Sequence, residues 1–322
     1  MQDKMEIFEW NINQRGGGKI KMPDFIAKVI AQKKSRIIIL TEFVKGEGYE
    51  ELKTRLEQAG YKIYHNEVSS QGNNEVLIAV KLDEHLSIES KPVEKMNTQQ
   101  KILPNFLQLN AIYCQKELIV IGVRIRVLPT YEKRGRVFFT EVKNEIKLVF
   151  EYLEKKTFTE ADIKKKILNI SRDGWKQLMV RFKELQIEAL KEHMDSINDN
   201  ILCSGDFNYK SKQLEEVVNW TDYEIITPTE GFSFAFGGGG LNNTSIDHII
   251  TKGLYAKDAN YDWKFMKMDE IYKGLSEEDN KSHLKGNPDH AILTADIIIE
   301  NEKISKVTKV VREKIYAENL IE

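Results

Sequence analysis

The residues of this chain that can do chemistry are polar and charged side chains at the ends of apolar runs. In chain order they are Asn11, Asn13, Glu42, Arg124, Asp206, Asn208, Asp247, Asp289 and His290. Carboxylate and amide oxygens are the ligands that Mg²⁺ and Mn²⁺ prefer, and the chain's two cysteines and six histidines are too few to favour zinc. An imidazole and a guanidinium beside these acids can move a proton and neutralise a phosphate. Together these residue types indicate metal-dependent hydrolysis of a phosphate ester.

The stretch ILCSGDFN at residues 201–208 shows this pattern clearly. An apolar run that suits a buried strand ends at Gly205, and Asp206 and Asn208 then flank one phenylalanine. Glycine, aspartate and asparagine are also common turn residues, so this stretch taken alone fits a plain turn equally well. Each other candidate has a similar structural alternative, but six apolar runs that all end in such residues favour a shared site.

Ten apolar runs of strand length position these residues. They are rich in β-branched residues and bounded by Gly, Asn, Lys or Pro, and some are apolar throughout, as in a sheet covered on both faces. The runs are MEIFEWNI, RIIILTEF, YKIYHNE, EVLIAVKL, HLSIES, FLQLNAIY, LIVIGVRIRV, ILCSGDF, SIDHIITK and AILTADIII. Helical patterns at 23–33, 48–59 and 175–197 lie between them, and this mixture predicts a layered α/β fold.

The overall composition limits the class of protein. The formal net charge is -2, so nucleic-acid binding would require a local basic patch, which a metal ion could assist. Cys114 and Cys203 lie in apolar runs, which indicates reduced core thiols. No apolar run approaches the roughly 20 residues of a membrane span, and the N-terminus has no stretch of signal length. We therefore expect a cytoplasmic protein that acts away from membranes, and no feature indicates an obligate protein partner.

Six motifs in a fixed order give the chain a family resemblance. They are WNIN (10–13), TEF (41–43), GVRI (122–125), GDFN (205–208), IDHI (246–249) and NPDHA (287–291). The series resembles the endonuclease/exonuclease/phosphatase superfamily, which has the deoxyribonuclease I-like fold, and it extends over nearly the whole chain. The resemblance implies an α/β fold of the α+β type. This fold is a four-layer sandwich of two mixed β-sheets packed face to face, with helices on both outer faces and the site at one edge.

The same resemblance implies one catalytic domain over residues 1–300. The lysine-rich stretch 132–172 lies within it and reads as a helical insertion. Residues 301–322 read as a C-terminal helix packed on the domain, because apolar residues recur there at helical spacing.

The family pattern assigns metal ligands to four of the candidate residues. Glu42 would be the principal carboxylate ligand of Mg²⁺ or Mn²⁺, with Asn11 close by. Asn13 stands where many relatives have an aspartate, so a second metal position would be weaker here. Asp289 would support the metal or its water.

The remaining residues would act on the phosphate and its protons. Asp206 would either position or deprotonate the attacking water or assist the leaving oxygen, since relatives are argued both ways. Asn208 would hold a phosphate oxygen. His290, oriented by Asp247, would be the other acid/base or phosphate-contacting group, because a carboxylate fixes the imidazole tautomer and stabilises its charged form. His248, beside Asp247, faces the other side of its strand by alternation and is expected to be structural.

The arginine at position 124 differs from the family pattern, in which this position is usually histidine or tyrosine. A guanidinium can hold phosphate oxygens with two hydrogen bonds but cannot act as a general acid near neutral pH. Arg124 is therefore expected to stabilise charge. Arg126 is the alternative occupant, because alternation along a strand places it on the same face.

We expect a Mg²⁺- or Mn²⁺-dependent phosphodiesterase, and specifically a nuclease with nucleic acid as its substrate, because nucleases are numerous in the superfamily. A phosphomonoesterase or a lipid-headgroup phosphatase is the alternative among enzymes. A non-catalytic binding module is a second alternative, since a fold does not fix a function. In the insertion, a lysine cluster forms either a basic patch beside the site or only a solvated helical face. Its members are Lys155, Lys156, Lys164, Lys165 and Lys166.

Overall fold

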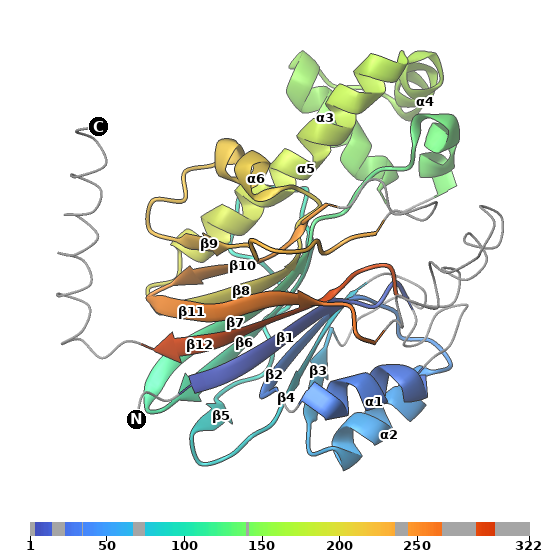
Figure 1. Cartoon of the computed structure of the whole chain (residues 1–322). Coiled ribbons are helices and arrows are strands. Elements are labelled where there is room, and N and C mark those ends of the chain that lie inside the picture. The colour runs from blue at the N-terminus through green and yellow to red at the C-terminus, as the bar shows by residue number, and fades with distance from the viewer. Residues whose placement is uncertain are drawn as a thin grey trace.

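The computed structural model describes residues 4–14, 23–33, 35–66, 75–139, 142–235, 244–265 and 288–299. Over these ranges, twelve strands form two six-stranded sheets (Figure 1). The first sheet has the order β11-β12-β1-β2-β4-β3, and the second has the order β5-β6-β7-β8-β10-β9. The strands are β1 (Lys4–Asn11), β2 (Ile37–Phe43), β3 (Lys62–His65), β4 (Glu75–Val80), β5 (Leu86–Ile88), β6 (Asn105–Tyr113), β7 (Lys116–Arg124), β8 (Asn200–Asp206), β9 (Glu224–Ile226), β10 (Asp247–Lys252), β11 (Leu254–Asp262) and β12 (Ile292–Ile299).

The strand register brings several strand ends to one end of the sandwich. β1 and β2 run parallel with Asn11 opposite Thr41, and β7 and β8 run parallel with Arg124 opposite Asp206. β10 and β12 run antiparallel to these neighbours, so they begin where the others end, and Asp247 lies opposite Asp206. The remaining pairs are antiparallel, so both sheets are mixed.

The two sheets pack face to face over a shared apolar core. Its fully buried members include Ile7, Ile39, Leu109, Val120 and Leu202, which come from both sheets. Gly122 of β7 lies where the sheets approach each other, and a Cβ atom there would be 2.4 Å from Cγ1 of Val76. A side chain at this position would therefore push the two sheets apart.

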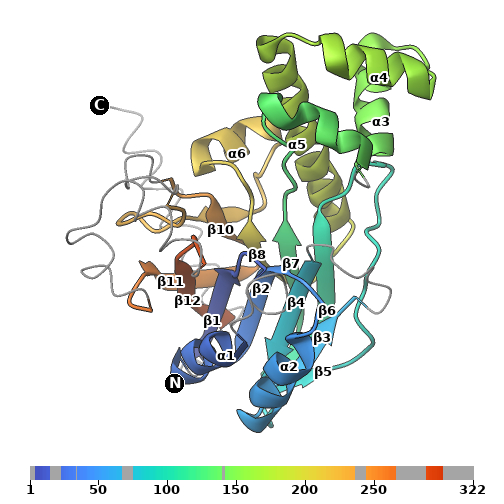
Figure 2. The same cartoon turned by 90° about the vertical axis from the view of Figure 1, so that its right-hand side faces the viewer.

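Helices cover both outer faces of the sandwich (Figures 1 and 2). The helices are α1 (Pro23–Lys33), α2 (Tyr49–Gln58), the 3-10 helix η1 (Tyr131–Phe139), α3 (Lys143–Glu154), α4 (Glu160–Asn169), α5 (Arg172–Asp195) and α6 (Ser211–Val217). α1 and α2 pack on the first sheet through residues such as Ile30 and Leu52, and α5 and α6 pack on the second through Leu190 and Leu214. The predicted four-layer arrangement of two mixed sheets is confirmed.

The lysine-rich segment forms η1, α3 and α4, which pack with the first half of α5. Their apolar side chains, among them Ile146, Phe150, Ile163 and Trp175, form a core separate from the sandwich. Thr159 begins α4 with a capping box to Asp162, as the spacing of these two residues predicts. In both views this unit projects beyond the ends of β7 and β8 (Figures 1 and 2).

Some features differ from the sequence-based expectations. β9 and β11 were not predicted; β11 (LYAKDANYD) is an edge strand that buries only its two end residues and has no continuous apolar pattern. Cys203 is a buried free thiol as expected, but Cys114 is only half-buried, because it lies with φ of 50° in the turn between β6 and β7. The predicted C-terminal helix at 301–322 lies outside the described residues. None of the helices in the described ranges is both long enough and apolar enough to cross a membrane.

Candidate active site

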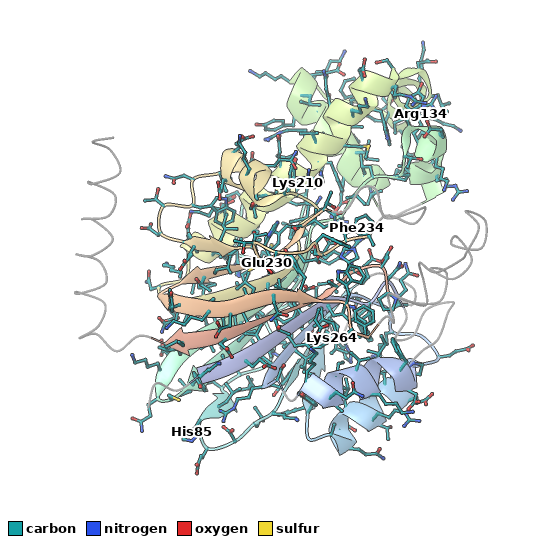
Figure 3. All side chains as sticks on the ribbon, in the orientation of Figure 1. His85, Arg134, Lys210, Glu230, Phe234 and Lys264 are labelled. Carbon is teal, nitrogen blue, oxygen red and sulfur yellow. The ribbon has the colours of Figure 1, made fainter. Side chains whose placement is uncertain are left out.

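The nine candidate residues gather where β1, β2, β7 and β8 end and where β10 and β12 begin. Phe234, labelled in Figure 3, lies at this end of the sheets, and a backbone bridge joins it to His290. All nine side chains are buried or half-buried. Polar contacts connect seven of them into one network and join the other two, Asp247 and His290, as a pair.

Glu42 lies in an irregular part of β2. The pairing of β2 with β4 shifts register between Leu40 and Phe43, and Glu42 itself has φ of 50°. A bulge of this kind redirects a side chain and is common beside active sites. Here it directs Glu42 to Arg124, whose Nη2 donates a 2.5 Å hydrogen bond to Glu42 Oε1. Burial raises the pKa of Glu42, but the charges of Arg124 and His290 outweigh burial and bring it below its usual value, so Glu42 is ionised.

Asp206, at the end of β8, is the centre of the polar network. Its Oδ2 accepts hydrogen bonds from Nδ2 of Asn11 at 3.0 Å and from Nδ2 of Asn208 at 2.9 Å. Nε of Arg124 lies 3.9 Å from the same oxygen. Burial and the nearby charge of Asp247 raise the pKa of Asp206 to about 7. A carboxyl group with this pKa can take up or release a proton near neutral pH.

Asn208 supports Asp206 from a left-handed backbone conformation, with φ of 52°. Its amide nitrogen donates to the carbonyl oxygen of Ile125 at 2.8 Å as well as to Asp206. Both N–H groups of the amide are therefore used within the protein. The expected contact of Asn208 with a phosphate oxygen would require this amide to turn.

Asp247 and His290 form a buried pair in which Nδ1 of His290 lies 2.9 Å from Oδ2 of Asp247. The backbone of Asp247 is fixed on both sides: its N–H donates to Oγ of Ser233 at 3.1 Å, and its carbonyl accepts from the Tyr261 hydroxyl at 2.7 Å. Burial lowers the pKa of His290, but Asp247 outweighs burial and raises it to about 10. In this charged form the imidazolium carries a second ring N–H, on Nε2.

Asn13 and Asp289 meet beside this pair. Nδ2 of Asn13 donates to Oδ1 of Asp289 at 2.8 Å, and the backbone N–H of Asn13 donates to Oδ1 of Asn11 at 2.9 Å. Asn11, the last residue of β1, and Asn13, in the turn after it, are therefore in contact, and Asn13 also contacts the acid from the loop before β12.

Arg126 and His248 lie outside the site. β7 ends at Arg124, so strand alternation no longer applies to Arg126, which donates to Glu145 of α3 at 2.7 Å. His248 faces the other side of β10, with Nε2 2.7 Å from the carbonyl oxygen of Tyr209. Arg124 is therefore the arginine of the site, and His248 supports the loop that carries Asn208.

Glu9 is an acid of the site that the sequence analysis did not single out. It is fully buried on β1, two residues before Asn11, and accepts a 3.3 Å hydrogen bond from the Thr41 hydroxyl. Burial and the charge of Asp247 raise the pKa of Glu9 well above its usual range. The alternation of β1 contains the information needed to find it, because Ile7 and Glu9 share the face toward the core.

Lys183 of α5 also reaches the site without a local sequence pattern to indicate it. Its Nζ donates to the carbonyl oxygen of Asn208 at 2.9 Å and lies 3.8 Å from the ring centre of Tyr209. Burial lowers the pKa of Lys183, and the charge of Asp206 acts against burial. Its position depends on how α5 packs on the second sheet, which no short motif encodes.

The donor chemistry of the site fits a hard divalent cation that keeps part of its hydration shell. Mg²⁺ commonly uses one or two carboxylates together with several waters, and Glu42 is such a carboxylate. Asn11 donates to Glu42, and its Oδ1 accepts from the N–H of Asn13, so the Asn11 amide would have to turn to offer its oxygen to the same ion. Among the described residues, no group of three or more Asp, Glu, His or Cys side chains forms a complete cage. Glu42 is already paired with Arg124, so a cation would meet a competing positive charge.

Comparisons with known proteins address the fold. No family model and no curated protein matches the sequence. Among solved structures, an endonuclease/exonuclease/phosphatase family protein from Bacteroides thetaiotaomicron is similar with a TM-score of 0.55 and 10% identity, over 94% of this chain and 100% of that one. TDP2 from D. rerio, complexed with a single-strand DNA product, gives a TM-score of 0.51 and 10% identity, over 92% and 99%. ANGEL2, a 2',3'-cyclic phosphatase complexed with adenosine-2',3'-vanadate, gives 0.50 and 14%, over 93% and 97%.

The chain has the deoxyribonuclease I-like fold. The likeness covers both sheets and agrees with the fold that the six motifs imply. At these identities the likeness is evidence for the architecture.

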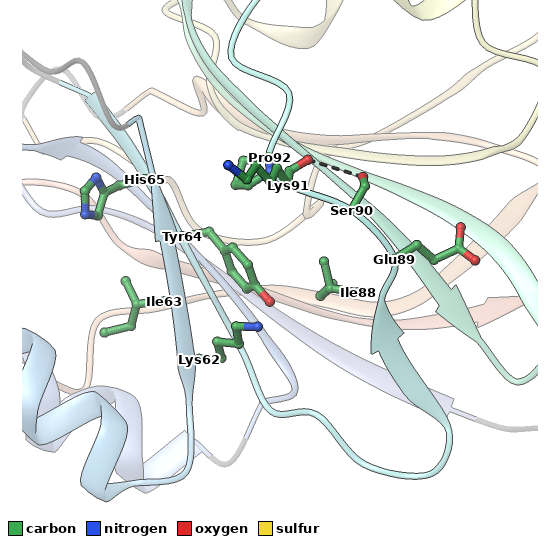
Figure 4. Close-up of a pocket in the computed structure, with 9 residues that line it drawn as sticks. All are labelled: Lys62, Ile63, Tyr64, His65, Ile88, Glu89, Ser90, Lys91 and Pro92. Carbon is green, nitrogen blue, oxygen red and sulfur yellow. Dashed lines mark hydrogen bonds between the residues drawn. The ribbon is translucent and has the colours of Figure 1, made fainter.

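In this deoxyribonuclease I-like sandwich, a cavity of about 530 Å³ lies between the edge strands β3 and β5 (Figure 4). Lys62, Tyr64, Ile88 and Lys91 are among its lining residues. The lining runs along all of β3, from Lys62 opposite Val80 to His65 opposite Leu77. None of the nine candidate residues lines this cavity.

Proposed function

We propose that this protein is a divalent-cation-dependent phosphodiesterase that hydrolyses nucleic acid. The observation that carries the proposal is the convergence of Arg124, Asp206 and the Asp247–His290 pair on one strand-end site that also holds Glu42. A guanidinium, an imidazolium and a carboxyl group with a pKa of about 7 are the groups required to bind a phosphodiester and move protons during its hydrolysis.

Each residue has a defined task in this proposal. Arg124 and protonated His290 bind the non-bridging phosphate oxygens and stabilise the charge that develops on them. Asp206 accepts a proton from the attacking water, and Asn11 and Asn208 hold its carboxylate in place. Glu42 and Asn11 would hold Mg²⁺ or Mn²⁺, which supplies further neutralisation of phosphate charge when bound.

The choice of nucleic acid as substrate is supported by the structural neighbours. TDP2 was crystallised with a single-strand DNA product, and ANGEL2 is described as a 2',3'-cyclic phosphatase. Both descriptions concern phosphate esters of nucleic acid or nucleotides, and we extend that substrate class to this chain.

A substrate screen tests the proposal directly. Single-stranded DNA, RNA, adenosine 2',3'-cyclic phosphate and a phosphoinositide are incubated with Mg²⁺, with Mn²⁺ and with EDTA. We expect hydrolysis of a nucleic-acid or nucleotide diester that requires the cation and falls by about 10²–10⁴ in Asp206→Asn. Glu145→Gln, which removes the partner of Arg126 outside the site, serves as the control and should retain activity. Hydrolysis of the phosphoinositide alone, or equal activity in EDTA, would contradict the proposal.

A further inference from the structure

We propose that Arg124 competes with the divalent cation for Glu42, so that the cation and the substrate phosphate bind cooperatively. In the absence of the cation, the guanidinium neutralises Glu42. When the cation binds Glu42, the guanidinium is released to bind phosphate. This inference rests on the proposed function, because it requires the cation to use Glu42.

The first observation is the position of the guanidinium. Nη2 of Arg124 donates to Oε1 of Glu42 at 2.5 Å, and the two side chains are only 10% and 16% exposed. A buried, close pair of this kind has strong mutual attraction, because little water screens it. A cation approaching Glu42 must therefore displace a partner that is already in hydrogen-bond contact.

The second observation is the charge around Glu42. Asn11 also donates to this carboxylate, and His290 contributes a positive charge nearby. If the guanidinium did not move, a divalent ion bound to Glu42 would lie close to the positive charge of Arg124. Two positive charges at short distance repel each other strongly in a buried site. The ion and Arg124 thus exclude each other at Glu42 unless the guanidinium moves.

The third observation is that Arg124 is not fully satisfied in its present position. Its buried Nε has no hydrogen-bond partner among the described residues and lies 3.9 Å from Oδ2 of Asp206. A guanidinium presents its N–H groups in a fork that matches two phosphate oxygens, so a bound phosphodiester can engage Nε together with an Nη. A bound phosphodiester therefore gives the released guanidinium a bidentate partner in place of Glu42.

Linkage makes this exchange reciprocal. If phosphate removes the guanidinium from Glu42, phosphate raises the affinity for the cation, and the cation raises the affinity for phosphate by the same factor. Histidine or tyrosine at this position would be less able to neutralise Glu42 in this way, so the coupling is a consequence of the arginine in this chain.

Calorimetric titration with Mn²⁺ tests the competition in the whole protein. Arg124→Gln removes the charge, and Arg124→Met is a second neutral variant of similar length in case the first folds poorly. Arg126→Gln is the matched control, because it removes a guanidinium two residues away that pairs with Glu145. We expect Mn²⁺ to bind the two Arg124 variants at least about tenfold more tightly than the wild type, and to bind Arg126→Gln as the wild type does.

A second titration tests the coupling with dimethyl phosphate as the phosphodiester probe. Dimethyl phosphate should tighten Mn²⁺ binding to the wild type and have a smaller effect on Arg124→Gln. Equal or weaker Mn²⁺ affinity in both Arg124 variants would overturn the competition while leaving a metal-dependent function intact. Absence of Mn²⁺ binding in the wild type and in all variants would overturn both the competition and the proposed metal dependence.

Discussion

The Nδ1 atom of His290 lies 2.9 Å from Oδ2 of Asp247, and both side chains are buried. These residues come from the starts of two strands in different sheets, since Asp247 begins β10 and His290 precedes β12. The contact therefore depends on how the sheets are packed. Because Nδ1 is engaged by Asp247, Nε2 is the ring nitrogen left for other partners.

If Asp247 acts only by orienting and charging His290, the two residues form one catalytic unit. Asp247→Asn and His290→Ala should each lower kcat, and the double variant should lose little more than His290→Ala alone, because coupled residues are non-additive. Steady-state kinetics on a phosphodiester substrate measures this. Losses that multiply fully in the double variant would show that the two residues act independently.

Glu9 makes a prediction about stability and pH. Its pKa is raised by burial, so the neutral form is favoured in the folded protein, and stability is highest below the ordinary pKa of a glutamate and falls as the pH rises above it. Glu9→Gln keeps the shape and removes this titration. As the pH rises, we expect the free energy of unfolding of the variant to increase relative to that of the wild type. The increase is up to about 1.4 kcal/mol per pH unit between the pKa of Glu9 in the unfolded chain and its pKa in the folded protein.

Thermal unfolding from pH 4.5 to pH 9 measures the difference between the two proteins. Glu6→Gln on the same strand is a control, because Glu6 is only half-buried and bonds Ser35 at the other end of β1. A constant difference between Glu9→Gln and the wild type at all pH values would show that Glu9 does not titrate as proposed.

Gly205 should be required for the geometry of GDFN. A Cβ atom at this position would lie 1.8 Å from the backbone oxygen of Val123, which cannot move as a flexible side chain can. Gly205→Ala is expected to destabilise the protein by roughly 2–4 kcal/mol and to lower the activity of what remains folded. Urea unfolding is the measurement, with Gly135→Ala as control, since no heavy atom lies within 4 Å of a Cβ built there. Equal midpoints for the two variants would refute the requirement.

The sequence predicted most of the fold because the inner strands have both faces covered. Runs such as EVLIAVKL and ILCSGDF are mostly apolar, and they form the inner strands β4 and β8, whose residues are almost all buried. β11 was missed because an edge strand with an exposed face needs no continuous apolar pattern. Local capping of α4 by Thr159 was predictable because its hydrogen bonds are between residues three positions apart.

The site was predictable to the extent that it depends on strand ends. Residues such as Glu42, Asp206 and His290 follow or precede apolar runs, so a common location could be inferred before their contacts were known. The Arg124–Glu42 pair and the Lys183 contact with Asn208 are different, because they join positions 82 and 25 residues apart through packing of separate elements. Pattern and spacing contain no direct information about such partners.

The lysine cluster of the insertion makes the last prediction. The unit of η1, α3 and α4 projects beyond the ends of β7 and β8, which carry Arg124 and Asp206 (Figure 2). Lys166 and Lys156 both pair with Glu154, at 2.5 Å and 3.9 Å, so we assign the phosphate contacts to the other three members, Lys155, Lys164 and Lys165.

Replacing Lys155, Lys164 and Lys165 by glutamine should weaken binding of single-stranded DNA. It should also reduce the slope of log affinity against log salt by up to about two units, because each lysine that contacts a phosphate releases less than one counterion from a single strand. Fluorescence anisotropy in EDTA at several salt concentrations measures binding without hydrolysis. The matched control replaces Lys62, Lys81 and Lys116, which the strand register places at the opposite end of the sheets. If both triple variants change the slope equally, the insertion serves as scaffold, and the substrate is selected by the strand-end site alone.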